Sequence, residues 1–233
     1  MAGGYMGKLL FVDLSKGELK DEALDEKICR DFIGGYGIGA RIIYNRQKAG
    51  VDALGPENIL GFMTGPLTGT PATCGARYAV VAGRSPLTGG WGDGNSGGYF
   101  GPHLKFAGYD GIFFTGASER PVYLFIDDGK AELRDASHLW GKSTYETEDT
   151  MQAELGKTAQ ISCIGPYGEK LSLIACIMNK RKAAIGRSGL GAVMGSKKLK
   201  AVAVRGNQKV PIADSKALNK LSREHIAEMR ALE

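Results

Sequence analysis

The sequence predicts an α+β fold in which two β-sheets with short helices form an intertwined internal repeat with pseudo-two-fold symmetry. A paired-strand spacing occurs twice, at residues 10–13 with 18–21 and at 124–127 with 132–135. Each pair is followed by a helix-compatible stretch, a strand that ends at a glycine turn, a glycine loop, a short helix and a last strand. The same order of elements twice in one chain is typical of two units that share a core. The units cover roughly residues 7–118 and 120–207.

The first unit opens with a predicted β-hairpin, because turn residues Ser15-Lys16-Gly17 separate two strand-like runs. Residues 26–33 then have a helical pattern, and the apolar run 59–64 predicts a strand that ends at Gly65. The Asn95-Ser96-Gly97-Gly98 loop precedes a short helical stretch and a strand at 112–115 that ends at a glycine.

The second unit repeats this order from a hairpin around Asp128-Gly129-Lys130. Ser143 and Glu146 have the spacing of a capping box, which predicts that a helix begins there. A strand at 161–164 is followed by a loop at 187–190 and by a strand at 201–205. After Pro211 the pattern predicts an amphipathic helix, so we expect one domain over residues 1–210 and the truncated start of a further helical domain over 211–233.

Composition excludes several classes of protein. The chain has 35 glycines but only 8 prolines in 233 residues, with 43% hydrophobic residues, which favours tight turns over disorder. The longest uncharged run, 58–76, is interrupted by glycines and prolines, so we expect no membrane helix, and no secretory leader is visible. The cysteines contain no CxxC pair, and reduced thiols in a cytoplasmic protein are expected.

Charge is unevenly placed along the chain. Residues 170–213 contain ten Lys or Arg and no Asp or Glu, although the net charge of the whole chain is only +5. A basic segment in an otherwise acidic chain indicates an anionic ligand, and a solvated basic face is the alternative. The segment has no aromatic residue on which bases could stack, so we expect no nucleic acid as a partner.

The two glycine loops are the candidate binding elements. Each combines backbone N–H groups with the start of a helix, which is how proteins commonly hold phosphate. Asn95 adds an amide to one loop and Arg187 a cation to the other. Two such loops related by pseudo-symmetry could hold two phosphates or one two-headed ligand, and ordinary tight turns are the alternative.

Other chemistries find little support in the sequence. Gly35–Ala40 satisfies GxGxxA, but a helical pattern precedes it, and Gly189–Gly195 is separated from the preceding strand by a basic loop. NAD(P) binding therefore stays only as an alternative. His103, His138 and His225 are far apart and have no nucleophile partner, so a hydrolase triad is not predicted.

The ordered motifs of the chain resemble those of a known family. From about Met6 onward the sequence closely resembles the N-terminal domain of the tungsten-containing aldehyde ferredoxin oxidoreductase family. The motifs that carry the resemblance are GPLTGT at 65–70, GARY at 75–78, NSGGYFG at 95–101, LKFAGYD at 104–110, DASHLWG at 135–141, Gly165-Pro166 with Gly168-Glu169, and GRSGLGAVMG at 186–195.

This resemblance implies that residues 1–210 form a bis-molybdopterin-binding domain. In the family, a two-sheet base carries tungstopterin, in which two pterin dithiolenes chelate one tungsten (or molybdenum), and Mg²⁺ bridges the two terminal phosphates. By motif, the cofactor-binding residues would be Arg77 near the iron–sulfur cluster, Asn95 and Gly97 at one pterin, and Ala184, Gly186 and Arg187 at the other. The backbone carbonyls of Asn95 and Ala184 would coordinate Mg²⁺.

The complete enzyme would oxidise an aldehyde to a carboxylic acid and pass electrons through a [4Fe–4S] cluster to ferredoxin. This chain lacks the CxxCxxxC ligands of that cluster, so we expect them in further domains or in a partner subunit, and we assign no catalytic residue here. It also has Ala183 where the family commonly has Arg, and Arg181 or Lys182 are the neighbouring cations. A non-catalytic pterin-binding or assembly module is the alternative function.

Overall fold

Each half of the chain begins with a β-hairpin at one side of its own sheet. In the computed structural model, which describes residues 3–232, β1 (Lys8–Asp13) pairs with β2 (Glu18–Ala23), and β7 (Val122–Asp127) pairs with β8 (Lys130–Asp135). The Asp13 carboxylate accepts hydrogen bonds from the backbone of the first turn, at 3.0 Å from the Ser15 amide. Both predicted hairpins are confirmed.

The two sheets have the same topology. The first has the strand order β2-β1-β6-β3-β4-β5, and the second has the order β8-β7-β12-β9-β10-β11. In both sheets the second and third strands of this order run parallel, β1 with β6 and β7 with β12. The remaining strands are β3 (Leu60–Thr64), β4 (Ala79–Arg84), β5 (Trp91–Ser96), β6 (Gly111–Thr115), β9 (Gln160–Cys163), β10 (Ile177–Asn179), β11 (Ala183–Ile185) and β12 (Leu199–Arg205). The predicted internal repeat in two sheets is confirmed.

One detail of the predicted repeat is wrong. We expected the loop 95–98 to correspond to 187–190, but α3 (Phe100–Phe106) and α6 (Leu190–Ser196) are the equivalent helices. Phe100 at the start of α3 corresponds to Leu190 at the start of α6, so Gly97 corresponds to Arg187 and not, as predicted, to Gly189. The two Ser-Gly pairs are not equivalent, because Ser96 is the last residue of β5 whereas Ser188 lies three residues after the end of β11.

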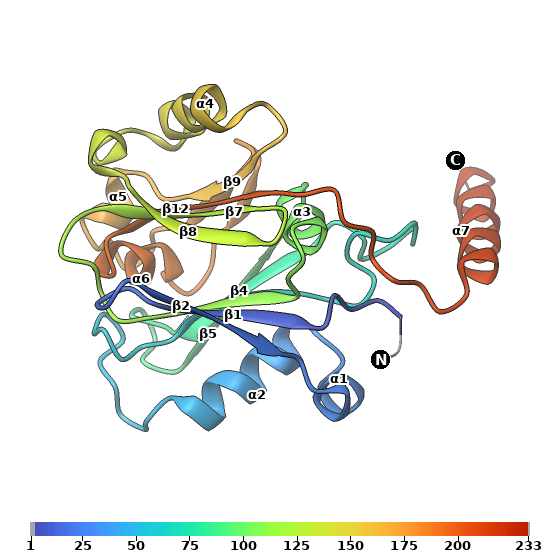
Figure 1. Ribbon diagram of the computed structural model, residues 1–233, viewed down its shortest axis with the longest axis horizontal. Coiled ribbons are helices and arrows are strands. Elements are labelled where there is room, and N and C mark those ends of the chain that lie inside the picture. The colour runs from blue at the N-terminus through green and yellow to red at the C-terminus, as the bar shows by residue number, and fades with distance from the viewer. Residues whose placement is uncertain (1–2, 233) are drawn as a thin grey trace.

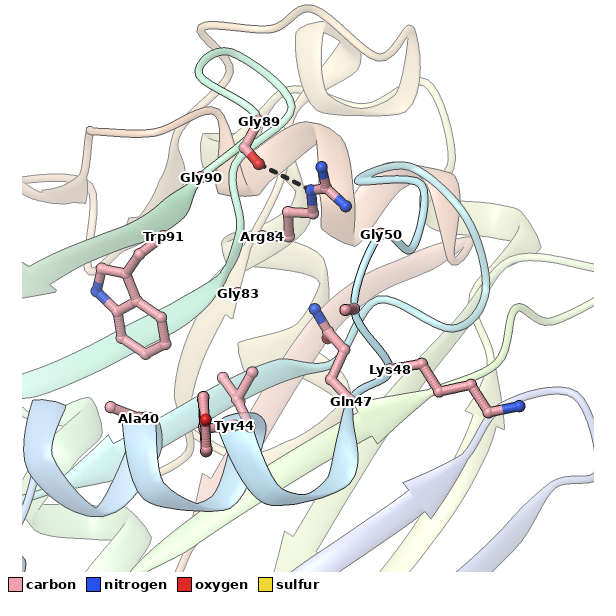
Figure 2. Close-up of a pocket in the computed structure, with 12 residues that line it drawn as sticks. Ala40, Tyr44, Gln47, Lys48, Gly50, Gly83, Arg84, Gly89, Gly90 and Trp91 are labelled. Atoms are coloured by element: carbon pink, nitrogen blue, oxygen red, sulfur yellow. Dashed lines mark hydrogen bonds between the residues drawn. The ribbon is translucent and has the colours of Figure 1, made fainter.

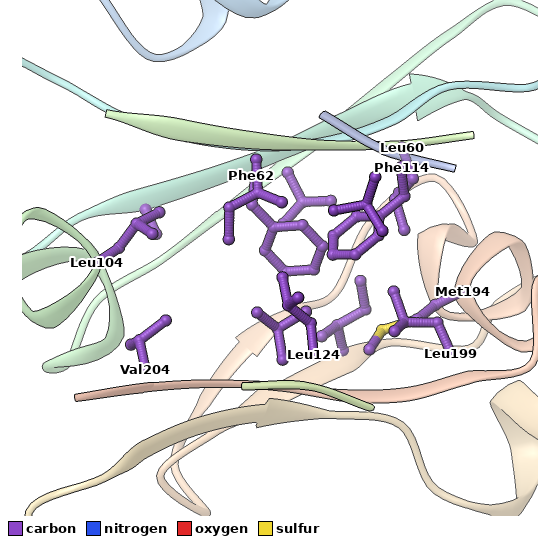
Figure 3. Close-up of a cluster of buried hydrophobic side chains, with 14 of the residues drawn as sticks. Leu60, Phe62, Leu104, Phe114, Leu124, Met194, Leu199 and Val204 are labelled. Carbon is purple, nitrogen blue, oxygen red and sulfur yellow. The ribbon is translucent and has the colours of Figure 1, made fainter. Parts of the chain in front are cut away.

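The main core lies between the two sheets (Figure 3). Phe62 and Phe114 of the first sheet face Leu124 of the second, and all three side chains are fully buried. Two short helices close this core, with Leu104 of α3 at one end and Met194 of α6 at the other. Helix α3 contacts β3 of its own sheet and β9 and β12 of the other, and α6 contacts β12 of its own sheet and β3 and β4 of the other. Each helix therefore packs against both sheets, which joins the two halves of the chain in one core.

Further helices cover the outer faces of the two sheets (Figure 1). α1 (Glu26–Phe32) and α2 (Tyr36–Arg46) pack on the first sheet, and η1 (Ser137–Leu139) with α4 (Thr144–Leu155) packs on the second. The capping box predicted at the start of α4 is present.

The last helix lies apart from the sheets. α7 (Ser215–Arg230) begins at an Asp214 cap and stands beyond the loop that precedes β4, as Figure 1 shows. It contacts that loop, where the Thr73 hydroxyl donates to the Ser222 carbonyl at 3.2 Å. One helix remains, the four-residue α5 (Pro166–Glu169), which contacts α6. Within residues 3–232, none of the helices has the length and apolar character needed to cross a membrane.

Candidate functional site

The edge strands of the two sheets meet and bring the two predicted half-sites together. β5 ends the first sheet and β11 ends the second. Just after β11, the Ser188 hydroxyl accepts a hydrogen bond from the Asp93 amide at 3.2 Å and donates one to the Asp93 carbonyl at 3.3 Å. A Cβ atom on Gly94 would lie only 2.8 Å from Ile185. The segments that were predicted to hold a two-headed ligand are therefore neighbours.

Asn95 and Arg187 lie at the exposed side of this junction, together with Tyr36 at the start of α2. Burial raises the pKa of Tyr36, the carboxylate of Asp93 raises it further, and Asn95 and Arg187 lower it. Tyr36 therefore lies within electrostatic reach of Asp93, Asn95 and Arg187 at this junction. The sequence did not indicate that Tyr36 and Asp93 belong here, because their elements are distant in the chain.

Arg77 reaches the same region through Tyr99. The Arg77 guanidinium carbon lies 4.7 Å from the centre of the Tyr99 ring, and the Lys180 ammonium lies 4.1 Å from it. Cations are attracted to the electron-rich face of an aromatic ring. Tyr99 therefore holds a cation from each half of the chain two residues after Gly97, a role that sequence analysis missed.

A cleft of about 790 Å³ opens beside these side chains. It lies between residues 70–78 and the Gly97-Gly98 loop, with Ile226 of α7 at its rim. Of the six predicted cofactor-binding residues, Arg77 and Gly97 line this cleft. The other four are exposed along the β5–β11 junction: Asn95, Ala184, Gly186 and Arg187.

Two of the predicted glycines have space beside them that no described residue fills. A Cβ atom on Gly97 would meet no atom within 4 Å, and one on Gly186 would meet only Ala184, at 3.9 Å. Neither has the positive φ angle that L side chains avoid. Neither backbone conformation nor packing therefore requires glycine here. A ligand that must approach the main chain closely would require it, so these residues fit an anionic cofactor with a phosphate arm.

The turn between β10 and β11 carries backbone strain. Lys180 and Arg181 both have positive φ angles, 48° and 57°, which cost non-glycine residues about 1–2 kcal/mol each. Arg181 pairs with Asp149 of α4, so its charge is directed away from the junction. Lys182 is exposed directly beside Ala183, the position at which the resemblance led us to expect Arg.

Part of the basic segment has a structural role that the sequence did not indicate. Lys200 is fully buried and contacts Glu169 at 2.5 Å and the Lys142 carbonyl at 2.9 Å. Lys197 is also fully buried and donates to the carbonyls of Pro56 and Gly116, each at 3.0 Å. These two lysines therefore belong neither to a solvated basic face nor to a site for an anionic ligand, the two interpretations of the basic segment.

The glycine motifs considered for NAD(P) are explained by packing. A Cβ on Gly37 would lie 2.1 Å from the Phe32 carbonyl, and one on Gly191 would lie 2.6 Å from the Cys176 carbonyl. Moreover, α1 rather than a strand precedes the first motif, as expected. Contact with protein backbone leaves no space for a dinucleotide at either position, so the alternative has no support.

A second cavity, of about 600 Å³, lies between α2 and the β4–β5 turn (Figure 2). Tyr44 and Trp91 face it, and the Arg84 side chain beside it donates to the Gly89 carbonyl at 2.8 Å. None of the predicted site residues lines this cavity. Among residues 3–232 there is also no group of three or more His, Cys, Asp or Glu that could hold a metal, so a cation would depend on other oxygen ligands.

Known proteins match this chain over almost its whole length. The family model described as "Aldehyde ferredoxin oxidoreductase, N-terminal domain" matches residues 9–206. The tungsten-containing aldehyde ferredoxin oxidoreductases of Pyrococcus furiosus and Thermococcus kodakarensis are 48% and 49% identical over 228 residues, which are 97% of this chain and 38% of each relative. A WOR-like subunit of an aliphatic sulfonate oxidoreductase from P. furiosus is 37% identical, with the same coverage.

A solved structure has the same fold. The active site complex BamBC of benzoyl coenzyme A reductase, bound to 1,5-dienoyl-CoA, superposes with a TM-score of 0.96 at 40% sequence identity. The match covers 99% of this chain and 35% of the BamBC chain. This chain thus spans a little over a third of the length of the proteins that it matches.

Proposed function

Since the chain belongs to the aldehyde ferredoxin oxidoreductase family, through its N-terminal domain, we propose that it forms the base of a tungstopterin site. The complete assembly would oxidise aldehydes to carboxylic acids with ferredoxin as electron acceptor. The observation that carries this proposal is the junction of two sheet edges, where Gly97 and Gly186 leave open space beside their main chains. The tungsten in the names of the relatives supports the choice of metal over molybdenum.

In this proposal each edge holds one pterin and its phosphate. Gly97 and Gly186 let the ligand approach backbone N–H groups, and Arg77 and Arg187 neutralise its negative charge. The carbonyls of Asn95 and Ala184 would hold Mg²⁺, which would offset the charge of the phosphates. Edge strands suit this role because their outward peptide groups have no strand partner, and carbonyl oxygens are ligands that Mg²⁺ accepts.

When bound, the tungsten centre supplies the two-electron redox chemistry. The residues of this chain bind the cofactor, orient it and compensate its charge, and none of them is proposed as an acid or base. We propose that residues 1–210 are this binding domain and that 211–233 begin a further helical domain. Further domains or a partner subunit supply the [4Fe–4S] cluster. All four cysteines are free thiols, which supports a reducing, cytoplasmic location.

Metal and pterin analysis of the protein purified from its native source tests the proposal. We expect tungsten and molybdopterin in a ratio of one to two, together with a larger iron–sulfur polypeptide or further domains of the same polypeptide. Pterin without an iron–sulfur component would instead support a non-catalytic assembly module. The absence of both pterin and metal from the native preparation would contradict the proposal.

A further inference from the structure

Asn179, the last residue of β10, links the two half-sites through its side chain. It is 2% exposed, and its amide nitrogen crosses to the other sheet, where it donates to the Gly97 carbonyl at 3.0 Å. A second, longer contact of 3.4 Å reaches the Ser96 hydroxyl. The Asn179 amide is thus a direct polar bridge between β10 and the loop that contains Gly97.

The chemistry of the contact determines how the amide is oriented. A backbone carbonyl only accepts hydrogen bonds, so the atom nearest Gly97 must be the nitrogen of Asn179. The amide oxygen then points elsewhere, and it is buried without a partner among the described residues. The amide therefore makes its buried hydrogen bond across the two sheets with its nitrogen, while its oxygen has no partner among the described residues.

The position of Asn179 in the chain shows which segments its hydrogen bond to Gly97 joins. It pairs with Ala183 across the β10–β11 hairpin, next to Ala184 of the second half-site. It also directly precedes Lys180, where the strained turn begins. Asn179 therefore ties the Gly97 loop to the hairpin that leads to Ala184 and Gly186, at the other end of β11 from the Ser188–Asp93 contacts.

We propose that Asn179 is a positioning residue that sets the separation of the Gly97 half-site from the Ala184–Gly186 half-site. The inference rests on the proposed function, because only a ligand that spans both half-sites requires a fixed separation. A two-headed ligand binds tightly only when both of its sites are held at the matching distance. The amide of Asn179 supplies this preorganisation without touching the ligand.

NMR of the 233-residue chain tests the bridge directly, through the backbone resonances of Gly97 and Gly186. We expect Asn179→Leu, which keeps the volume but removes the donor, to shift the Gly97 carbonyl resonance and to broaden those of Gly186. Asn179→Asp, which keeps the shape, should do the same while the carboxyl is ionised. Acidification should reverse the change, because a protonated carboxyl can donate to the Gly97 carbonyl again.

Ser162→Ala is the matched control. Ser162 faces Asn179 in the β9–β10 pair, and its buried hydroxyl also lacks a partner, but no contact joins it to Gly97. This variant should leave the Gly97 and Gly186 resonances in place. A merely structural role for Asn179 predicts equal effects of the two substitutions and no reversal with pH in Asn179→Asp.

Cofactor retention in the assembled holoprotein completes the test. Loss of one hydrogen bond that preorganises the site should lower pterin retention about fivefold in Asn179→Leu and leave Ser162→Ala unchanged. Unshifted Gly97 resonances, or shifted resonances with full retention, would overturn this inference and leave the proposed function intact. A wild-type protein without pterin would overturn both.

Discussion

Glycines in the packed region around α5 and α6 differ from those at the two sheet edges. A Cβ atom on Gly195 would lie 2.0 Å from the Gly168 carbonyl, and one on Gly168 would lie 2.9 Å from the Gly191 carbonyl. In contrast, a Cβ on Gly97 would meet nothing within 4 Å, and Gly186 is almost as open. Both kinds of glycine occur within the same motif-rich stretches, and only their surroundings separate them.

The difference shows which glycines the fold requires. In the packed region two backbones approach so closely that any side chain would push them apart. At the edges the described chain offers no such reason, and under the proposed function a bound cofactor would be what requires glycine there. Substitutions at the two kinds of site should therefore affect different properties, stability in the first case and ligand retention in the second.

The largest effect is expected from Gly195→Val. The added side chain overlaps the backbone of α5, which cannot move without disturbing the core, so we expect a loss of about 4 kcal/mol or more in the free energy of unfolding. Urea denaturation followed by circular dichroism measures it. A midpoint equal to that of the wild type would show that the close approach of α5 and α6 is not required.

Gly97→Val should have the opposite profile. We expect stability within about 0.5 kcal/mol of wild type, because the side chain enters open space, but a roughly hundredfold weaker retention of pterin in the holoprotein. Gly90→Val is a matched control, since Gly90 also has an open Cβ position and no positive φ, but lies at the β4–β5 turn. Full tungsten and pterin content in Gly97→Val would contradict the distinction between glycines that the fold requires and glycines that a ligand requires.

The free energy of unfolding should depend on pH through Lys197, which is buried next to the packed region. Burial lowers the pKa of Lys197 to about 8, well below its usual 10.5. The unfolded chain therefore holds more protons than the folded chain between these two values, and stability should rise with pH in this window. We expect the wild type to gain about 2 kcal/mol relative to Lys197→Met between pH 8 and 10. Parallel pH profiles for the two proteins would show that Lys197 does not titrate there.

The smallest effect is expected from Arg187→Ala. Arg187 is exposed at the junction, so its removal should leave the melting temperature unchanged. Loss of one charge-assisted contact to a phosphate or pterin should weaken retention about tenfold. Lys209→Ala, which removes an exposed cation of the same basic segment, is the control. Equal pterin content in both variants would separate Arg187 from the cofactor.

The order of elements could be predicted from the sequence because the signals are local. The hairpin turns, the capping box at Ser143 and the recurring spacing of apolar runs each depend on neighbouring residues. The strands β4, β5, β10 and β11 were not predicted. β10 and β11 have three residues each and β5 contains two glycines, so their pairing depends on partners elsewhere in the chain, whereas β4 has an apolar run at 79–82 that the prediction did not use. These are the strands that form the outer parts of the two sheets and the edge junction.

The candidate site was predicted only in part for the same reason. Motifs placed Asn95 and Arg187 in two separate glycine loops, and the structure brings these segments to one junction, although the repeat was matched two residues out of register. Tyr99, Lys180 and Asn179 were missed because contacts between sheets, not patterns along the chain, give them their roles.

By itself, the sequence determined that the chain is a two-unit α+β domain of the aldehyde ferredoxin oxidoreductase family. The spacing of the strand-like runs and the order of the motifs can both be recognised along the chain without knowledge of its folding. Only the tertiary structure decided which glycines the fold requires and which lysines are buried. It also showed that the Asn179 amide joins the two half-sites. Those properties depend on the distance between segments far apart in the chain, and packing of the two sheets sets that distance.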